Sequence, residues 1–245
     1  MPIHDFKSQR LFLDHPMHPH AAVELDRNQA NYLISVLRMK AGSQILVFNG
    51  RDGEWQAELE VTGRKSGTLT LIEQTRSQPP ASDLIYCFAP LKQARLDYMV
   101  QKATEMGAGI LQPVVTQHTQ TQKINPERMR ANAIEAAEQC GILSVPACRE
   151  MVRLDALLNE WDTERVLIFA DEAAAETNPL DALKQYRGKP LGLLIGPEGG
   201  FTQAERDQIL ALENTVTVSL GPRILRADTA AVAALAVIQA ACGDW

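Results

Sequence analysis

The chain has 245 residues, of which 45% are hydrophobic and 22% are charged, and its formal net charge is −6. These values describe a soluble globular protein with a buried core, long enough for one large domain or two of ordinary size. The acidic balance excludes a global attraction for nucleic acid, but it leaves room for a local basic face.

No segment of the sequence suggests secretion or membrane insertion. The first residues, MPIHDFKSQRLFLDHP, contain no apolar signal core. The most apolar run, from Thr229 to Cys242, is short and rich in alanine, which indicates a buried or interface helix. The cysteines are scattered without C-x-x-C spacing, so we expect a cytoplasmic protein with no disulfide framework and no structural metal.

The first part of the chain, up to a proline-rich boundary at 76–83, is predicted to be mainly β. Asp26 can cap a helix over RNQANYLISVLRM, with Leu33, Val36 and Leu37 on one face. Strands are then expected at 44–48, 54–61 and 68–73, joined by the hairpin turns NGRDG and TGRKSG. This pattern favours a small barrel-like module.

The rest of the chain alternates between strand and helix patterns. Strands are expected at 84–89, 110–116, 166–170, 191–195 and 215–220, and helices at 92–107, from Asn125 and Pro126 to Gly141, at 179–187, at 203–212 and from about 229. Such alternation predicts an α/β domain with a parallel sheet covered on both faces.

Two neighbouring strands of that sheet end in unusual loops. LGLLI runs into Gly196-Pro197-Glu198-Gly199-Gly200, and TVTVSL runs into GPRILR at 221–226. Ligands of open α/β sheets bind outside the carboxyl ends of the strands, where glycines permit close approach of the backbone.

The spacing of these loops argues against phosphate binding. G-x-x-G-G differs from the G-x-G-x-x-G of dinucleotide sites, the following strand lacks a terminal acid, and no Gly-Lys-Ser/Thr completes a P-loop. Glu198 would repel a pyrophosphate but would tolerate a cation. The apolar Leu194, Ile195, Ile224 and Leu225 can hold an adenine ring and a ribose. The carboxylate nearby, which tolerates a cation, points to a sulfonium cofactor. For the GPEGG loop, the alternative is a plain strand-to-helix turn in which Thr202 and Glu205 form a capping box for the next helix.

Four stretches, two of which contain the glycine loops, resemble a known family. LIGPEGGFTQAE, SLGPRILRADTA, KATEMGA and EAAEQCGILSVP, together with the segment from Asn31 to Leu59, resemble the ribosomal RNA small subunit methyltransferase E family over nearly the whole chain. The resemblance implies a homodimeric enzyme that uses S-adenosylmethionine to methylate uridine N3 in 16S rRNA. It also implies a PUA-like RNA-binding domain at 1–77 and a SPOUT methyltransferase domain with a trefoil knot at 78–245.

The resemblance assigns roles to particular residues. The expected cofactor-binding residues are Ala170, Leu194, Ile195, Gly196, Pro197, Gly199, Gly200, Leu220, Gly221, Ile224, Leu225, Arg226 and Ala230. The expected RNA-binding residues are Arg10, Arg38, Lys40, Arg95 and Lys102.

Uracil N3 carries a proton, so its methylation needs a base or a cation that stabilises the uracil anion. Arg226 is the expected cation, and Asp228 and Glu198 are candidate bases or orienting groups. Asp228 as the N-cap of the last helix is an equal alternative. For the whole protein, a ribose 2′-O-methyltransferase and a non-catalytic RNA-binding protein are the competing hypotheses.

Two further patterns, a basic helix face and a histidine-rich stretch, each allow an interpretation without a ligand. Lys92, Arg95 and Lys102 can share one helix face toward RNA phosphate, although a solvated face has the same spacing. The histidines of His15-Pro-Met-His18-Pro-His20 are held extended by prolines and lack a completing ligand, so we expect a solvent loop without metal.

Overall fold

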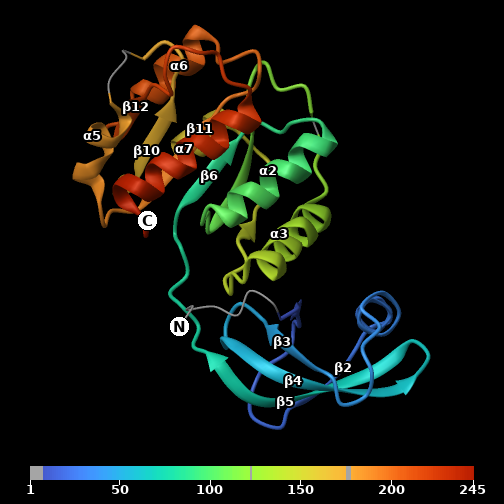
Figure 1. Cartoon of the computed structure of the whole chain (residues 1–245). Helices are drawn as coiled ribbons and strands as arrows, with labels where there is room; N and C mark the ends of the chain where they lie inside the picture. Colours follow the sequence, from blue (N-terminus) through green and yellow to red (C-terminus); the bar gives the residue numbers. More distant parts are fainter. Residues whose placement is uncertain (1–7, 122, 175–177) are drawn as a thin grey trace. The chain divides into compact units, whose positions relative to one another are not determined.

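The computed structural model describes residues 8–121, 123–174 and 178–245, and its contacts divide the chain into two compact units (Figure 1). Unit 1 comprises the residues up to Pro80 together with Ala137–Val145, and unit 2 comprises Ala81–Ala136 and Pro146–Trp245. A segment from the middle of the chain therefore completes the N-terminal unit. None of the helices among the described residues is long and apolar enough to cross a membrane.

Unit 1 is built on a five-stranded sheet in the order β1-β3-β4-β5-β2. Its strands are β1 (Arg10–Phe12), β2 (Ala22–Glu24), β3 (Gln44–Phe48), β4 (Glu54–Gly63) and β5 (Ser66–Arg76). The three long strands form an antiparallel meander, which confirms the strands and turns predicted there. The short strands β1 and β2, which pair with β3 and β5, escaped prediction because three residues carry no readable alternation.

The helix predicted after Asp26 forms, but most of it is a π-helix. Asp26 caps α1 (Arg27–Ala30) through a capping box, and the chain continues as η1 (Asn31–Val36). The wider i→i+5 turn shifts the phase of the later side chains. Leu33 is fully buried, whereas Val36 is 61% exposed, so the prediction that these two residues share one face of the helix is wrong.

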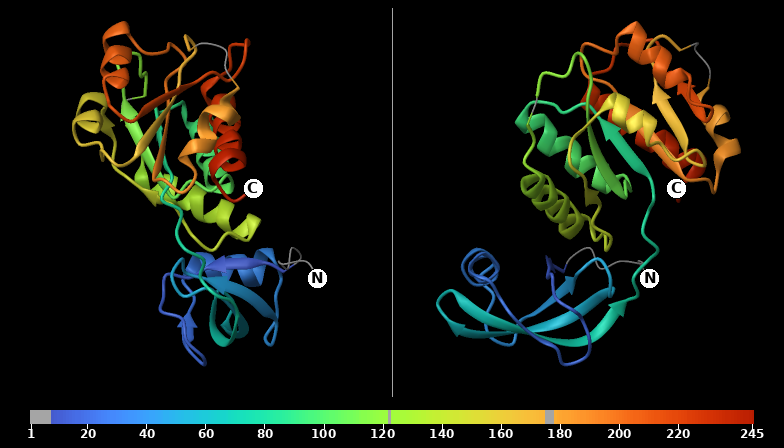
Figure 2. Two further views of the ribbon diagram at one scale, coloured as in Figure 1. Left: turned by 90° about the vertical axis from the view of Figure 1, so that its left-hand side faces the viewer. Right: turned by 180° about the vertical axis from the view of Figure 1, so that it is seen from behind.

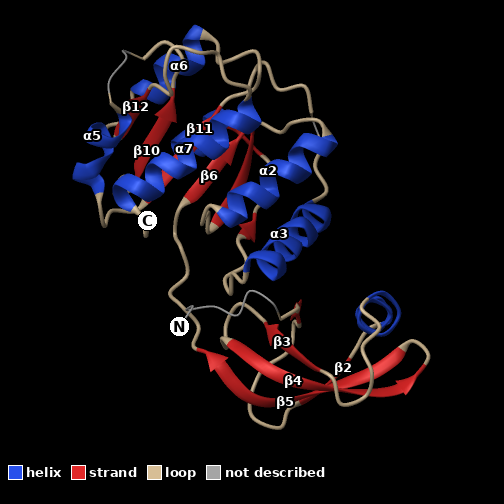
Figure 3. Cartoon of the chain, viewed as in Figure 1, coloured by secondary structure: helices blue, strands red, loops and turns tan. Residues whose placement is uncertain are grey.

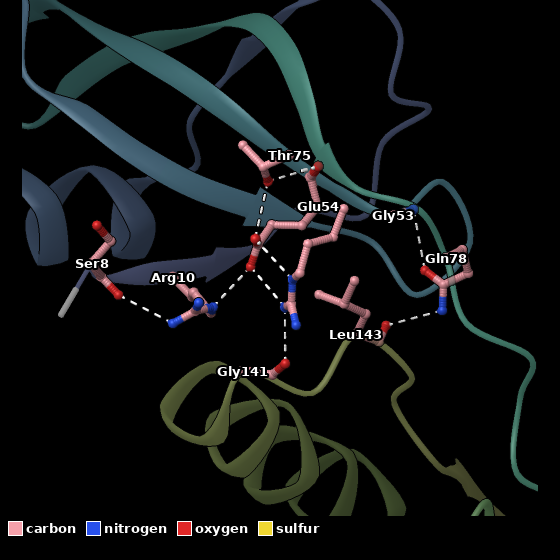
Figure 4. Close-up of polar contacts among 9 residues, drawn as sticks. Ser8, Arg10, Gly53, Glu54, Thr75, Gln78, Gly141 and Leu143 are labelled. Atoms are coloured by element: carbon pink, nitrogen blue, oxygen red, sulfur yellow. Dashed lines mark hydrogen bonds and ion pairs between the residues drawn. The ribbon is translucent and has the colours of Figure 1, made fainter. Parts of the chain in front are cut away.

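A network of buried charges lies in unit 1 beside the segment 137–145, which includes the end of α3 (Pro126–Cys140) (Figure 4). Glu54 accepts hydrogen bonds from Arg10 Nε at 2.9 Å and from Arg76 Nη2 at 2.8 Å. Arg76 also donates to the Gly141 carbonyl at 2.9 Å, and Gln78 donates to Ser144 Oγ at 3.1 Å. These contacts fix the segment against the sheet of unit 1.

Unit 2 contains a parallel sheet in the order β12-β10-β11-β6-β7-β8, with β9 beside β7 (Figure 3). Its strands are β6 (Ile85–Phe88), β7 (Ile110–Val115), β8 (Ala147–Cys148), β9 (Val152–Arg153), β10 (Val166–Ala170), β11 (Leu191–Ile195) and β12 (Thr215–Val218). The α/β class and the parallel sheet are thereby confirmed.

Helices cover both faces of this sheet (Figures 1 and 2). On one face, α7 (Ala227–Cys242) contacts both α2 (Gln93–Glu105) and α5 (Pro179–Leu183), and the 3-10 turn η2 (Lys184–Tyr186) contacts α5 and α7. On the other face, α4 (Leu154–Asn159) and α6 (Gln203–Leu210) pack onto a core that includes Leu167, Phe169 and Leu194. The sequence predicted each of these helices except α4.

Candidate active site

Unit 2 contains a cavity of about 500 Å³ at the carboxyl ends of β10, β11 and β12, three strands that are neighbours in the sheet. Its walls are the loops that follow these strands, at 169–174, 195–201 and 218–225, and the start of α7 closes it. The cavity therefore lies where an open parallel sheet is expected to bind a ligand.

Most of the residues expected to bind a cofactor line this cavity. They are Ala170, Ile195, Gly196, Pro197, Gly200, Leu220, Gly221, Ile224, Leu225 and Ala230, and Glu198 joins them. Leu194, Gly199 and Arg226 are not part of the lining. Leu194 is fully buried against α6, because successive side chains of a strand point to opposite faces and Ile195 takes the cavity side.

The GPEGG loop is a tight turn that depends on its glycines. The Gly200 N–H donates to the Pro197 carbonyl at 2.9 Å, and Gly200 has a φ of 66°, which favours glycine. A Cβ atom at Gly196 would lie 2.5 Å from the ring of Phe201. The loop leads directly into α6, where Thr202 and Glu205 form the expected capping box. The turn and the cavity wall are thus the same structure, and the two interpretations of the loop do not exclude each other.

An ion pair that the sequence reasoning missed supports the loop after β10. Asp171 is 5% exposed, and its carboxylate accepts hydrogen bonds from Arg206 Nε at 3.0 Å and from the Ala173 N–H at 3.0 Å. Both Asp171 and Arg206 line the cavity. An acid at the carboxyl end of a predicted buried strand was the available signal, since that position faces the ligand edge of the sheet.

Arg226 and Asp228 are joined at the start of α7. Arg226 Nη2 donates to Asp228 Oδ2 at 2.5 Å, and the Thr229 N–H donates to Asp228 Oδ1 at 2.9 Å. The N-cap of α7 is Arg226, so the alternative that Asp228 caps the helix is wrong. Burial raises the pKa of Asp228, but these hydrogen bonds outweigh it and hold the pKa below its ordinary value.

Glu198 is the acidic residue at the tip of the GPEGG turn. It is exposed, lines the cavity, and meets Arg95 of α2 with an N–O distance of 3.3 Å. Because both side chains are nearly half exposed, this pair is a weak tether. Glu198 is therefore accessible from the cavity, whereas Asp228 is engaged by Arg226.

The expected RNA-binding residues fall into two groups. Arg38 and Lys40 are exposed on the loop after η1, and Arg95 and Lys102 lie on α2, where Lys102 also bonds to Glu105 and sits 5.7 Å from the Tyr98 ring centre. Arg10 is 6% exposed and bonded to Glu54. The expectation that Arg10 contacts RNA is thus corrected, because its guanidinium belongs to the buried network of unit 1.

The histidine stretch near residue 20 is an exposed loop. His15, His18 and His20 are all exposed, and within the described ranges no group of three or more His, Cys, Asp or Glu side chains is placed to hold a metal ion. The ring Nδ1 atoms of His15 and His18 instead contact the carbonyls of the prolines that follow them.

Comparisons with known proteins assign the two parts of the chain. Residues 77–239 match the family model of an RNA methyltransferase domain, and residues 25–72 match that of an RNA methyltransferase PUA domain. These matches define the class of the chain, an RNA methyltransferase with an attached PUA domain, and the cavity lies in the part that matches the methyltransferase domain.

Relatives narrow this class to one family. Ribosomal RNA small subunit methyltransferase E of Bacillus subtilis is 30% identical over 86% of this chain and 87% of its own length, and that of Rickettsia conorii is 29% identical over 95% and 96%. The chain belongs to the ribosomal RNA small subunit methyltransferase E family, as its motifs suggested.

Solved structures agree with this assignment. The family member from Neisseria gonorrhoeae, bound to S-adenosylmethionine, has 26% identity and a TM-score of 0.87 over 97% of this chain and 99% of its own. A putative methyltransferase from Legionella pneumophila, also with S-adenosylmethionine, has 28% identity and a TM-score of 0.85 over 98% and 100%. The likeness covers both units of the chain.

Proposed function

We propose that this protein transfers the methyl group of S-adenosylmethionine to N3 of one uridine in the 16S rRNA of the small ribosomal subunit. It is an S-adenosylmethionine-dependent RNA methyltransferase by family, and S-adenosylmethionine is the ligand of both solved relatives named above. The cavity formed by the loops after β10, β11 and β12 is the observation that carries the proposal, because the two glycine motifs of the sequence meet there.

The residues of the cavity fit such a cofactor. Its volume of about 500 Å³ lies within the range of small-molecule sites, which is about 300 to 1,000 Å³. Ile195, Leu220 and Leu225 offer apolar surface for an adenine ring, and the carboxylates of Glu172 and Glu198 favour a cationic group. S-adenosylmethionine supplies, when bound, a methyl group on a positively charged sulfur.

The remaining chemistry belongs to the side chains around the target base. Arg226, held by Asp228, is positioned to stabilise negative charge on the uracil carbonyl oxygens as the N3 proton leaves. Asp228 orients this cation and is a poor base, because its pKa is lowered by Arg226 and the Thr229 N–H. Glu198, accessible from the cavity, is the better candidate to accept the proton.

The RNA is proposed to contact residues 1–77, the PUA-like domain, as well as the catalytic domain at 78–245. Arg38 and Lys40 are exposed, and so are Arg27, Arg64 and Lys65 of the same unit. Exposed basic side chains of this kind hold phosphates and position the RNA without reading its bases. Arg95 and Lys102 on α2 extend the proposed contact to the domain that carries the cavity.

We further propose the trefoil knot of the SPOUT domain, a homodimer and a cytoplasmic location, all of which rest on the family resemblance. Ile224, which lines the cavity, is 95% exposed and is therefore available to a partner subunit. Light scattering of the purified protein tests the dimer, and a particle with the mass of one chain would contradict it.

Two measurements test the catalytic proposal. Calorimetric titration of the purified protein with S-adenosylmethionine is expected to show binding, and no binding would leave only an RNA-binding role. A nucleoside digest of methylated 16S rRNA is expected to contain N3-methyluridine. A ribose-methylated nucleoside would instead select a 2′-O-methyltransferase.

A further inference from the structure

The loop that follows β7 touches the outer side of the GPEGG turn. His118 lies in this loop, and its Nδ1 atom is 3.0 Å from the Gly199 carbonyl oxygen and 3.1 Å from the Gly200 carbonyl oxygen. Because both neighbours are acceptors, Nδ1 must carry the proton and donate to them. The neutral Nδ1–H tautomer and the imidazolium ion both meet this requirement.

The His118 loop is itself fixed. Thr119 Oγ1 accepts from the Thr116 N–H at 2.9 Å, and the Gln117 N–H donates to Glu205 Oε1 at 2.7 Å. Glu205 is the same residue that caps α6 through its other oxygen. The imidazole is therefore presented from a short turn tied at both ends.

His118 contacts Gly199 and Gly200, the part of the GPEGG loop whose backbone has the greatest conformational freedom. Two consecutive glycines lose more conformational entropy on ordering than any other pair. Gly200 lines the cavity, and its N–H closes the turn by donating to the Pro197 carbonyl. Gly199 faces His118: a Cβ atom added at Gly199 would lie 3.2 Å from the Cβ atom of His118. The glycine pair is thus held from inside by its own turn and from outside by one imidazole.

We propose that His118 is a positioning residue for the cofactor: its Nδ1–H fixes the Gly199 and Gly200 carbonyls and preorganises the GPEGG wall of the cavity. This inference rests on the proposed function, and it adds a residue that lies outside the cavity lining. Preorganisation raises affinity because less ordering remains to be done on binding. His118 acts on cofactor affinity, and the transfer step with bound cofactor is unaffected.

A matched pair of variants of the full-length protein tests this role. The side-chain amide of H118N places a donor where Nδ1 lies, and H118D has the same shape but faces the two carbonyls with an acceptor. We expect H118N to bind S-adenosylmethionine and S-adenosylhomocysteine within about twofold of the unaltered protein, and H118D to bind them about tenfold more weakly. Titration calorimetry measures both, and in rRNA assays H118D raises the KM for S-adenosylmethionine while kcat is preserved.

Controls separate this role from folding and from the proposed function. H18D alters another exposed histidine whose Nδ1 lies 3.1 Å from a carbonyl, that of Pro19, and is expected to bind normally. Thermal unfolding identifies any loss of structure in H118D, and H118L then provides a second variant without a donor. Equal affinity of H118N and a folded H118D or H118L would overturn the proposal. Failure of the unaltered protein to bind S-adenosylmethionine would overturn the proposed function as well.

Discussion

At the scale of single residues, the start of α7 brings a cation and an anion together over two positions. Arg226 keeps 58% of its side chain exposed although Asp228, with 10%, holds its guanidinium. A restrained but accessible cation of this kind stabilises developing charge without having to reorganise first. In the proposed reaction, the carboxylate of Asp228 contributes by fixing Arg226.

Removal of the Arg226 guanidinium is expected to lower turnover and to leave the affinity for the cofactor unchanged. R226A should lower kcat by about a hundredfold, the size of effect found for one electrostatic group. D228N keeps the shape of the orienting group and should lower kcat by about tenfold. Calorimetry should give both variants the S-adenosylmethionine affinity of the unaltered protein, and an R226A enzyme with full turnover would refute the assignment.

Glu54 should make the stability of the protein depend on pH. Burial raises its pKa, but hydrogen bonds from Arg76 and Arg10 outweigh this and lower it below 4.5. A lowered pKa means that the stabilisation is complete above pH 4.5 and is lost as the pH falls through the folded-state value.

The variant E54Q tests this prediction. It leaves two guanidinium groups without their carboxylate, so we expect a free energy of unfolding about 3 to 5 kcal/mol lower at neutral pH, with a smaller further loss below pH 4.5. Urea unfolding at several pH values measures both effects. E73Q alters an exposed glutamate of the same sheet and should retain the pH dependence. Equal pH profiles for the two variants would contradict the role of Glu54.

At the scale of elements, α6 depends on its cap more than a longer helix would. It runs only from Gln203 to Leu210, and Glu205 bonds at once to Thr202 and to the loop that carries His118. The helix start is therefore part of the cavity wall and not merely a surface feature.

The cap of α6 gives a direct stability prediction. T202A should lower the free energy of unfolding by about 1 kcal/mol, the usual cost of losing a side-chain cap. T202S keeps the hydroxyl and should remain within a few tenths of the unaltered protein. Thermal unfolding compares the two variants, and equal losses in both would show that the methyl group, not the cap, is important.

The helices and strands show how much of the fold could be predicted from the sequence. The bounds of β10 and β11 were predicted to the residue, because short buried runs bounded by turn residues are distinctive. The π-helix was missed, since its i→i+5 bonding leaves no mark in hydrophobic periodicity. Arg10 was misplaced for a different reason: its partner Glu54 lies 44 positions away, and such pairing exists only in the folded chain.

The same distinction applies to the cavity. Its glycine loops could be located from the sequence because both follow predicted strands that end at one edge of the sheet. The support given by Asp171 to Arg206, and by His118 to the GPEGG turn, joins segments far apart in the chain. Such contacts form only in the folded chain, so local residue patterns could not predict them.

At the scale of the whole molecule, the cavity proposed to bind the cofactor lies in unit 2, whereas Arg38 and Lys40, two of the residues proposed to bind RNA, lie in unit 1. The double variant R38E/K40E should weaken binding of the rRNA substrate and lower the slope of log affinity against log salt by about 1 to 2, since each phosphate contact contributes about 0.7 to 0.9. S-adenosylmethionine affinity should stay unchanged.

Filter binding at several salt concentrations measures this slope. The double variant R153E/K184E makes the same change in net charge at exposed residues of unit 2 and should leave the slope nearly unaltered. A uniform loss in both double variants would mean that total charge, and not the loop after η1, governs the attraction for RNA.

The inclusion of residues 137–145 in unit 1 has a consequence for biosynthesis. Residues up to Pro80 are translated before this segment, so Arg76 and Phe48 cannot contact Gly141 and Leu143 until residues 137–145 have been made. The N-terminal unit of the nascent chain can reach its final structure only when more than half of the protein has been made. Stalled nascent chains ending near residue 130 should therefore be digested by protease within this unit more readily than chains ending near residue 190.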